Sequence, residues 1–400
     1  MFGFKGIILP KEVWALIIIN MMMSIIFNFT SIFINLFLWN QGQNIFSVSL
    51  FNLSSVALLF VSYLVGSYFL YQRSIRFVLV MSCIFAGFSF FALYLSHGQA
   101  KEWMIIFVGA MSGITQGLFW SANNSALYRF LKSEQYADYF SVNTVIAQAV
   151  TILVPLFSSL IIFELTFHVA FLFMLIFVIF GLLSTLRLPN VSMHQSLYQD
   201  IGFKKTFSKP GTKWSIGAIF SSGFINQFLA LFSMVFIFNI TNQVGMVALL
   251  NVGYSIVSLG GLFLYRRYHI SQNKWLIIGV LLIFSSYIMA LYDQLTLGIM
   301  VVLFMRLGSL FFSASSSRQR YRVLMQGDII WRTKMGMWLE IPLVLARSSV
   351  LIVALYVHEV KDGAFLLLII LSSLAMLLIP FFQTRSIAEY EAVYGVGAGL

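Results

Sequence analysis

The sequence has little of what soluble proteins depend on. Only 9% of its 400 residues are charged, where a soluble domain has roughly a quarter, and 60% are hydrophobic. A single cysteine, Cys83, excludes an internal disulfide and any site with several cysteine ligands. The 5 histidines form no pair at metal-binding spacing, and the sequence has no glycine-rich phosphate loop. The composition therefore predicts an integral membrane protein, and we expect no enzyme activity, no metal and no cofactor.

The chain is instead rich in long apolar runs. A membrane-spanning helix needs about 20 mostly apolar residues. Twelve windows of this kind lie near 13–39, 47–71, 75–97, 103–128, 140–163, 167–187, 214–239, 244–265, 275–293, 296–317, 335–357 and 363–384. No small-residue cleavage site precedes the end of the first window, so we expect it to be retained as a helix. The windows predict an all-α integral membrane protein with twelve transmembrane helices.

The two halves of the chain resemble one another. Residues 66–73 read Gly-Ser-Tyr-Phe-Leu-Tyr-Gln-Arg, and residues 260–267 read Gly-Gly-Leu-Phe-Leu-Tyr-Arg-Arg. A second echo pairs residues 119–125 with 311–317, each followed shortly by Tyr-Arg. We therefore predict two pseudo-symmetric six-helix bundles, residues 1–187 and 214–400, the second ending in a short cytoplasmic tail. The basic segment 188–213 is predicted to be the cytoplasmic linker.

The positive charges predict how the chain lies in the membrane, because Lys and Arg in short loops stay on the cytoplasmic side. With both termini inside, 2 of the 24 Lys and Arg residues, Lys101 and Lys361, fall in outer loops, and 2 more fall inside windows. The remaining 20, among them Arg332 and Lys334, fall in inner loops or at the inner ends of windows. We therefore assign the net charge of +11 to membrane orientation and expect no nucleic-acid partner. The predicted location is the cytoplasmic (inner or plasma) membrane, with both termini cytoplasmic.

This arrangement resembles the major facilitator superfamily of transporters. After its second helix that family carries a Gly, an Asp, a second Gly and basic residues. Here the aligned stretch begins at Ser67, beside Gly66, and keeps the basic residues, but Tyr71 replaces the Asp and the second Gly is missing. The missing acid argues against the charge latch that the family uses. Gly66 and its counterpart Gly260 predict close contacts between helices.

The resemblance implies a central cavity lined by the first, fourth, seventh and tenth helices. On the first helix, Asn28, Ser31 and Asn35 follow helical spacing and share one face. The full set of candidate substrate-binding residues is Asn28, Ser31, Asn35, Gln116, Trp120, Asn123, Asn124, Asn226, Gln227, Arg306, Ser313 and Arg347. The alternative for each polar member is hydrogen bonding between helices, typically about 0.6 kcal/mol in membrane proteins.

Three ionisable residues lie well inside predicted helices: Arg306, Glu340 and Arg347. A charge at the bilayer centre costs about 2.5–3.5 kcal/mol, so such residues are rare. Arg306 and Arg347 fall halfway along consecutive helices, which predicts similar depth in an antiparallel pair. Two interpretations remain open. The trio is either a charge-balanced packing device or a site for an anionic or zwitterionic group, with Glu340 as proton carrier or counter-charge.

These observations favour a secondary active transporter that works by alternating access. We expect a monomer in the lipid bilayer that moves a small or amphipathic molecule, with Glu340 coupling transport to protons. Export or flipping is preferred because the candidate residues mix amides with Trp120, and because residues 154–159, with Pro155, resemble a stretch of drug and proton antiporters. The alternatives are uptake of an organic anion, drawn by Arg306 and Arg347, and a non-transporting membrane sensor or scaffold.

Overall fold

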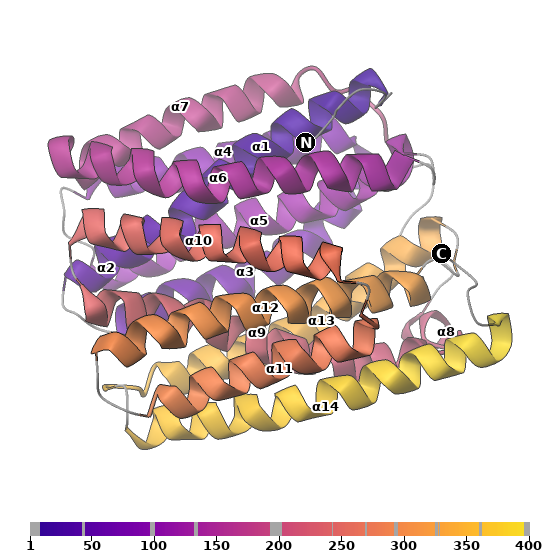
Figure 1. Ribbon diagram of the computed structural model, residues 1–400. Coiled ribbons are helices and arrows are strands. Elements are labelled where there is room, and N and C mark those ends of the chain that lie inside the picture. The colour runs from indigo at the N-terminus through magenta and orange to yellow at the C-terminus, as the bar shows by residue number, and fades with distance from the viewer. Residues whose placement is uncertain are drawn as a thin grey trace. The chain divides into compact units, whose positions relative to one another are not determined.

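A computed structural model describes residues 9–41, 45–96, 101–131, 135–192, 202–241, 243–268, 270–291, 295–324, 327, 329–359 and 362–395 (Figure 1). All regular elements in this part of the chain are helices. They are α1 (Lys11–Phe29), a π-helical turn (Thr30–Ile34), α2 (Asn35–Asn40), α3 (Ile45–Gln72), α4 (Ile75–Leu95), α5 (Glu102–Phe130), α6 (Tyr136–Leu165), α7 (Phe167–Thr185), α8 (Phe203–Thr206), α9 (Thr212–Ile240), α10 (Val244–Arg267), α11 (Gln272–Met289), α12 (Leu295–Leu324), α13 (Ile329–Ala354) and α14 (Gly363–Tyr394).

Twelve helical stretches among the described residues are long and apolar enough to cross a membrane, and each falls on a predicted window. The first combines α1, the π turn and α2, from Lys11 to Asn40. Several helices run beyond the apolar windows: α14 continues to Tyr394, where the window ends at 384. A helix continues into water as long as no residue breaks it, so hydropathy locates the membrane part and not the helix end. The prediction of twelve transmembrane helices is confirmed.

The chain separates into two compact units: Met1–Phe37 with Ala57–Leu197, and Leu38–Val56 with Tyr198–Leu400. In the first unit α1 packs against α5, α6 and α7, and α4 packs against α5 and α7. The second unit repeats this pattern, because α9 packs against α12, α13 and α14, and α11 against α12 and α14. The repeated packing agrees with the duplication predicted from the sequence echoes. The boundaries at 187 and 213 stay a prediction.

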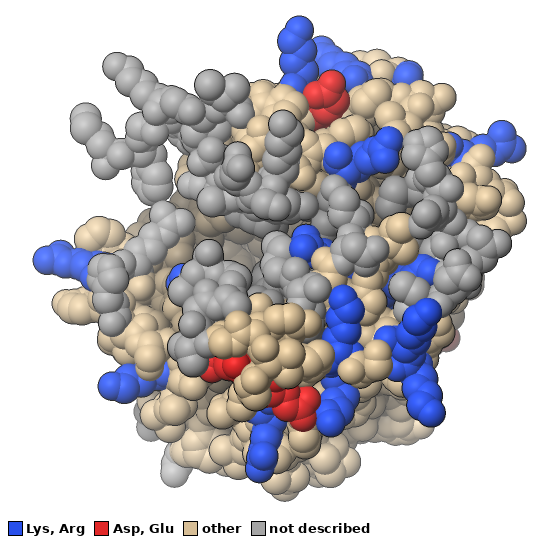
Figure 2. Space-filling view, turned by 90° about the vertical axis from the view of Figure 1, so that its right-hand side faces the viewer, with Lys and Arg blue, Asp and Glu red and all other residues tan. Residues whose placement is uncertain are grey.

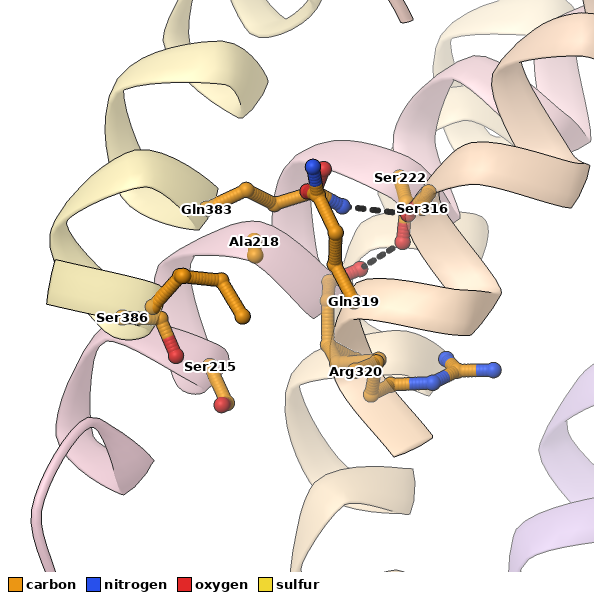
Figure 3. Close-up of a pocket in the computed structure, with 10 residues that line it drawn as sticks. Ser215, Ala218, Ser222, Ser316, Gln319, Arg320, Gln383 and Ser386 are labelled. Atoms are coloured by element: carbon orange, nitrogen blue, oxygen red, sulfur yellow. Dashed lines mark hydrogen bonds between the residues drawn. The ribbon is translucent and has the colours of Figure 1, made fainter. Parts of the chain in front are cut away.

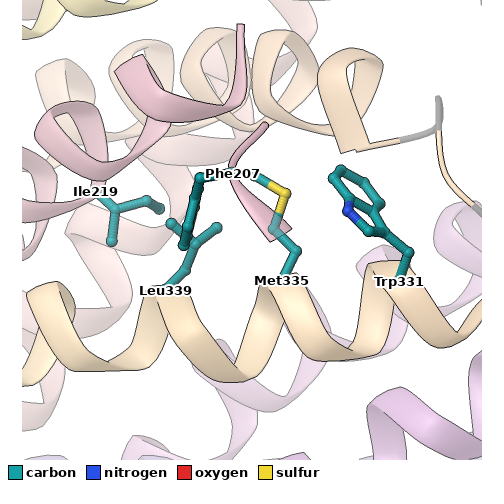
Figure 4. Packing of buried hydrophobic residues seen from close by; sticks show 5 residues of the cluster. All are labelled: Phe207, Ile219, Trp331, Met335 and Leu339. Atoms are coloured by element: carbon teal, nitrogen blue, oxygen red, sulfur yellow. The ribbon is translucent and has the colours of Figure 1, made fainter. Parts of the chain in front are cut away.

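The segment before α9 packs against α13 within the second unit. Trp331, Met335 and Leu339 recur every four residues along α13 and therefore share one face, which contacts Phe207 and Ile219 (Figure 4). The Trp331 indole Nε1 also donates a hydrogen bond to the Thr206 carbonyl oxygen at 3.2 Å. Residues 193–201 of the predicted linker lie outside the described residues.

Many of the Lys and Arg residues that we placed in inner loops belong to helices instead, because the helices run beyond the apolar windows. Arg332 and Lys334 belong to α13, which begins at Ile329, and the Lys334 side chain is only 2% exposed. The charges near this helix start made the window appear to begin at 335. Figure 2 shows the end of the molecule where α8 lies, with many Lys and Arg side chains and few Asp or Glu. That is the distribution predicted for an inner face; the side itself stays a prediction, and Lys361 lies outside the described residues.

Candidate functional site

The predicted polar face of the first helix is interrupted by the π-helical turn. The Asn28 side chain is half-buried, and its Oδ1 is buried with no hydrogen-bond partner in the described part of the chain. The exposed Ser31 donates to the Asn28 carbonyl oxygen at 2.9 Å, and the buried Asn35 donates from Nδ2 to the Ser31 carbonyl oxygen at 2.8 Å. A π turn holds more residues than an α turn, so the residues after it rotate away from the face that regular spacing predicts. Ser31 and Asn35 accordingly differ in exposure.

Asn123 on α5 joins a buried network that the sequence did not single out. Asn20 on α1 donates from Nδ2 to the Asn123 Oδ1 and to the Tyr139 hydroxyl oxygen, both at 3.0 Å, and to the Leu16 carbonyl oxygen at 2.9 Å. Asn20, Asn123 and Tyr139 are at most 6% exposed. The network joins α1, α5 and α6, so Asn123 makes the interhelical hydrogen bond that was the alternative interpretation.

Trp120 offers an exposed aromatic surface on α5. Its side chain is 42% exposed, and its ring stacks on Phe27 at 6.3 Å and meets Phe119 edge-on at 5.1 Å. Gln116 and Asn124, on the same helix, are half-buried. An exposed ring held by two others can stack against a ligand without ordering further.

In the second unit the predicted residues lie on α9 and α12. Asn226 is exposed and Gln227 is buried. Ser313 is exposed and donates to the Leu310 carbonyl oxygen at 3.2 Å. The Arg306 side chain is half-buried, and its Nε is buried with no hydrogen-bond partner in the described residues. A guanidinium in this position is an unsatisfied donor that an acceptor on a ligand can engage.

The three charges inside the membrane do not form one cluster. The electrostatic neighbour of Arg306 is the buried Tyr254, on α10. Glu340 and Arg347, both half-buried on α13, interact with each other, and Glu340 also with Arg320 on α12. The expected antiparallel pair of α12 and α13 is not a main packing contact. Instead, α13 packs chiefly on α9, and α12 packs chiefly on α11. Arg306 therefore stands apart from the Glu340 group.

A salt bridge lies at the start of α9, where Lys213 Nζ is 3.4 Å from Glu389 Oε1. The same carboxylate accepts the Trp214 Nε1 hydrogen at 2.6 Å and the Gly211 backbone hydrogen at 3.1 Å. That contact fixes α14 to the start of α9, close to the chain segment that contains α8.

The close helix contacts predicted at Gly66 and Gly260 are confirmed at the first position and wrong at the second. A Cβ on Gly66 would lie 2.2 Å from the Ser121 Oγ, so α3 and α5 approach closely there. A Cβ on Gly260 would meet nothing within 4 Å, whereas one on Gly261 would lie 2.9 Å from Leu307. The close approach in the second half is therefore one residue further along than the sequence echo placed it.

Sequence reasoning missed Asn20, Tyr139, Tyr254 and Arg320. Asn20 had a signal, since it precedes Asn28 by eight residues, about two helical turns. The tyrosines had none, because the chain contains 17 of them and nothing in their spacing marks these two. Arg320 lies at the predicted inner end of its helix, where a positive charge is ordinary.

A helical membrane protein with two similarly packed units, polar groups inside each and charges within the spans has the architecture of a membrane transporter. The sequence profile of the Major Facilitator Superfamily matches residues 13–321. The chain belongs to this superfamily, whose members are transporters and not enzymes. Glu340 and Arg347 lie beyond the matched residues.

Solved structures share the fold at low sequence identity. The nucleoside transporter NupG superimposes with a TM-score of 0.66 at 13% identity, over 94% of this chain and 100% of its own. A POT family transporter bound to a thioalcohol-conjugated peptide gives 0.70 at 12%, over 96% and 98%. The E. coli fucose:proton symporter FucP gives 0.60 at 11%, over 94% and 98%. No curated protein sequence matches this chain.

Proposed function

We propose that this protein is a secondary active transporter that moves a small or amphipathic molecule across the cytoplasmic membrane by alternating access. The observation that carries the proposal is the superfamily match over residues 13–321 together with twelve membrane-crossing helices. Similar structures include transporters for nucleosides, peptides and fucose. The proposal includes a monomer with both termini in the cytoplasm.

Within this proposal, protons drive export or flipping through Glu340. The carboxyl group lies near the middle of α13, two residues before Pro342, and interacts with Arg347 and Arg320. A proline removes the helical hydrogen bond to the fourth residue before it and loosens that turn. A carboxyl group in a loosened turn between guanidiniums can take up and release a proton as the guanidiniums move. The similar fucose transporter is a proton symporter.

The test uses purified protein in proteoliposomes with a panel of candidate substrates and an imposed pH gradient. We expect Glu340→Gln to abolish gradient-driven transport while substrate counterflow persists, since counterflow needs no proton release. Glu164→Gln, at the exposed end of α6, is the matched control and should behave as wild type. Unchanged gradient-driven transport in Glu340→Gln would remove the proton role. The direction of the gradient that supports transport separates export from uptake.

Uptake of an organic anion is the second candidate, and Arg306 is the observation in its favour. Its buried Nε has no partner among the described residues, and Tyr254 supplies a hydroxyl close by, so a carboxylate or phosphate would be well received. We expect anions to raise the melting temperature of the wild type and to lose that effect in Arg306→Gln. Arg318→Gln, exposed on the same helix, is the control. Equal responses of the two variants would rule out this site.

A further inference from the structure

A small polar pocket lies inside the second unit, between α9, α12 and α14 (Figure 3). Six polar side chains of its wall are Ser215, Ser222, Ser316, Gln319, Gln383 and Ser386. The cavity volume is about 20 Å³, which is room for one water molecule and far too little for an organic substrate. The pocket is therefore separate from the substrate site proposed above.

Two buried glutamines point acceptor atoms into this space without a partner. Gln383 donates from Nε2 to the Ser316 hydroxyl oxygen, and Gln319 donates from Nε2 to the Asn273 Oδ1 at 2.6 Å. Gln319 is 9% exposed and Gln383 is 6% exposed. The Oε1 atoms of both are buried and accept no hydrogen bond from the described residues. Figure 3 shows the two carboxamide groups near each other in the pocket.

The serines of the wall cannot satisfy both acceptors. The Ser222 hydroxyl donates to the Ile219 carbonyl oxygen at 3.0 Å, and the Ser386 hydroxyl donates to the Gly211 carbonyl oxygen at 2.7 Å. Those hydrogens are already used, as is that of Ser215, which donates to the Gly211 carbonyl oxygen at 3.5 Å. The Ser316 hydroxyl hydrogen remains, and it can serve only one of the two oxygens. A buried carbonyl oxygen without a donor is costly, because it has given up its hydrogen bonds to water. The site therefore needs at least one further donor, and a small molecule with hydrogens to donate can supply it.

We propose that the pocket binds one water molecule as a fixed part of the second unit. The water donates one hydrogen to Gln319 Oε1 and the other to Gln383 Oε1. It accepts the hydrogen of Ser316, whose oxygen receives the Gln383 amide. Three hydrogen bonds are typical of a buried water. The water thus links α12 to α14 at the wall of α9.

Charge decides against an alkali cation in the same place. Arg320 lines the pocket, and none of the ten lining residues is acidic. Its guanidinium extends away from the two carboxamides (Figure 3), and its electrostatic neighbour Glu340 is not among the lining residues, so the wall itself is positively charged. A cation would meet this repulsion in a poorly screened interior, where unlike water it also pays a large desolvation cost.

The direct test is a structure of the full-length protein, purified without alkali metal salts, at a resolution that shows ordered water. We expect one density peak at about 2.6–3.2 Å from both Oε1 atoms. No peak at that position overturns the proposal. A peak that appears only after sodium or rubidium chloride is added, with rubidium anomalous signal, also overturns it and assigns a cation.

A double-mutant cycle, read out by melting temperature, tests the shared water independently. Gln319→Met and Gln383→Met each remove one of its acceptors, and in the described structure the amide of Gln319 bonds to Asn273 and that of Gln383 to Ser316, not to each other. If the two glutamines share one water, the melting temperature of the double variant should fall by less than the sum of the falls in the two single variants. The reason is that the first substitution already releases the water. Additive losses would contradict the proposal. Gln72→Met, on the exposed end of α3, should add to Gln383→Met without coupling.

Discussion

At the residue scale, Asn20 shows how a single amide holds three membrane helices together. Its Nδ2 group contacts acceptors on its own helix α1, on α5 and on α6. Inside a membrane there is no water to replace a lost partner, so each acceptor counts toward stability. The network belongs to the internal packing of the first unit.

Asn123→Leu should therefore destabilise the protein. The loss should fall between about 0.6 kcal/mol, typical of one interhelical hydrogen bond in a membrane, and about 3 kcal/mol, the upper range for a buried group left without its partner. Thermal unfolding of the purified protein measures it. Asn124→Leu, at the half-buried neighbouring position, is the control and should change the melting temperature less. Equal losses would mean that the network adds nothing.

Asp362 caps α14 just outside its membrane span. Its carboxylate accepts the backbone hydrogens of Phe365 at 2.8 Å, His358 at 2.7 Å and Glu359 at 3.5 Å. Partial desolvation acts to raise the pKa of Asp362, but these hydrogen bonds and the nearby His358 outweigh it and lower the pKa below its ordinary value of 3.8. A lowered pKa in the folded state means that the ionised form stabilises the fold.

Asp362→Asn should reveal this effect through pH. The charge at the helix N-terminus contributes about 0.3–1 kcal/mol. It is fully present above the ordinary pKa of 3.8, and it is lost as pH falls through the lower folded pKa. Melting curves of wild type and variant should differ near neutral pH and converge below about pH 4. A gap that stays constant with pH would show that the charge has no role.

Spacing along one helix predicted part of the candidate site and could not predict the rest. It placed Asn28, Ser31 and Asn35 on one face, but it assumed α-helical turns, and the π turn at Thr30–Ile34 changes that phase. It identified Asn123 as important but not its partner, because a sequence does not say which helix faces which. The roles of these residues toward a substrate stay predictions.

At the scale of elements, α11 and α12 are joined by direct backbone contact. A Cβ on Gly279 would lie 2.6 Å from the Phe312 nitrogen and 2.8 Å from the Gly308 oxygen. Backbone atoms cannot move aside as a flexible side chain can. Glycine at this crossing is therefore required for the two helices to pack as closely as they do.

Gly279→Ala should separate the two helices and cost about 1–3 kcal/mol, as overpacking does in other cores. Gly260→Ala is the matched change on α10, where the new methyl group meets open space. It should be neutral or stabilising by up to about 1 kcal/mol, because alanine favours the helix. Melting temperatures of both variants provide the comparison. Destabilisation by Gly260→Ala alone would reverse the assignment of the close contact.

Element positions followed from hydropathy, whereas element partners did not. The apolar windows identified all twelve spans because the bilayer requires their length. They could not show that α13 packs on α9 instead of α12. Helices that are adjacent in the sequence often pack together. In the second unit, however, α13 packs mainly on α9, the first membrane helix of the unit. The prediction that Arg306 and Arg347 lie on a packed antiparallel pair of helices depended on the assumption that consecutive helices pack together.

At the scale of the whole molecule, the duplication makes a prediction about sidedness. The loop after α3 contains Arg73 and the end of α10 contains Arg267, the equivalent positions of the two halves. With six spans in each half, these positions must lie on the same side of the membrane.

Reporter fusions after Arg73 and after Arg267 should both report the cytoplasm, and a fusion after Lys101 should report the opposite side. Alkaline phosphatase, active only outside, and green fluorescent protein, fluorescent only inside, give complementary readouts. Opposite signals from Arg73 and Arg267 would contradict the twelve-span topology. Inverted but matching signals would keep the topology and reverse its orientation.

Cys83 gives this chain an experimental advantage. It is the only cysteine, it is 1% exposed on α4, and its sulfur would lie 3.5 Å from a methyl group placed on Gly181 of α7. A thiol shielded in this way between two helices is out of reach of bulky maleimides and nitroxides. Spin labels or fluorophores can therefore be attached at chosen sites without first engineering away a native thiol, and distances between labelled pairs can be followed through a transport cycle.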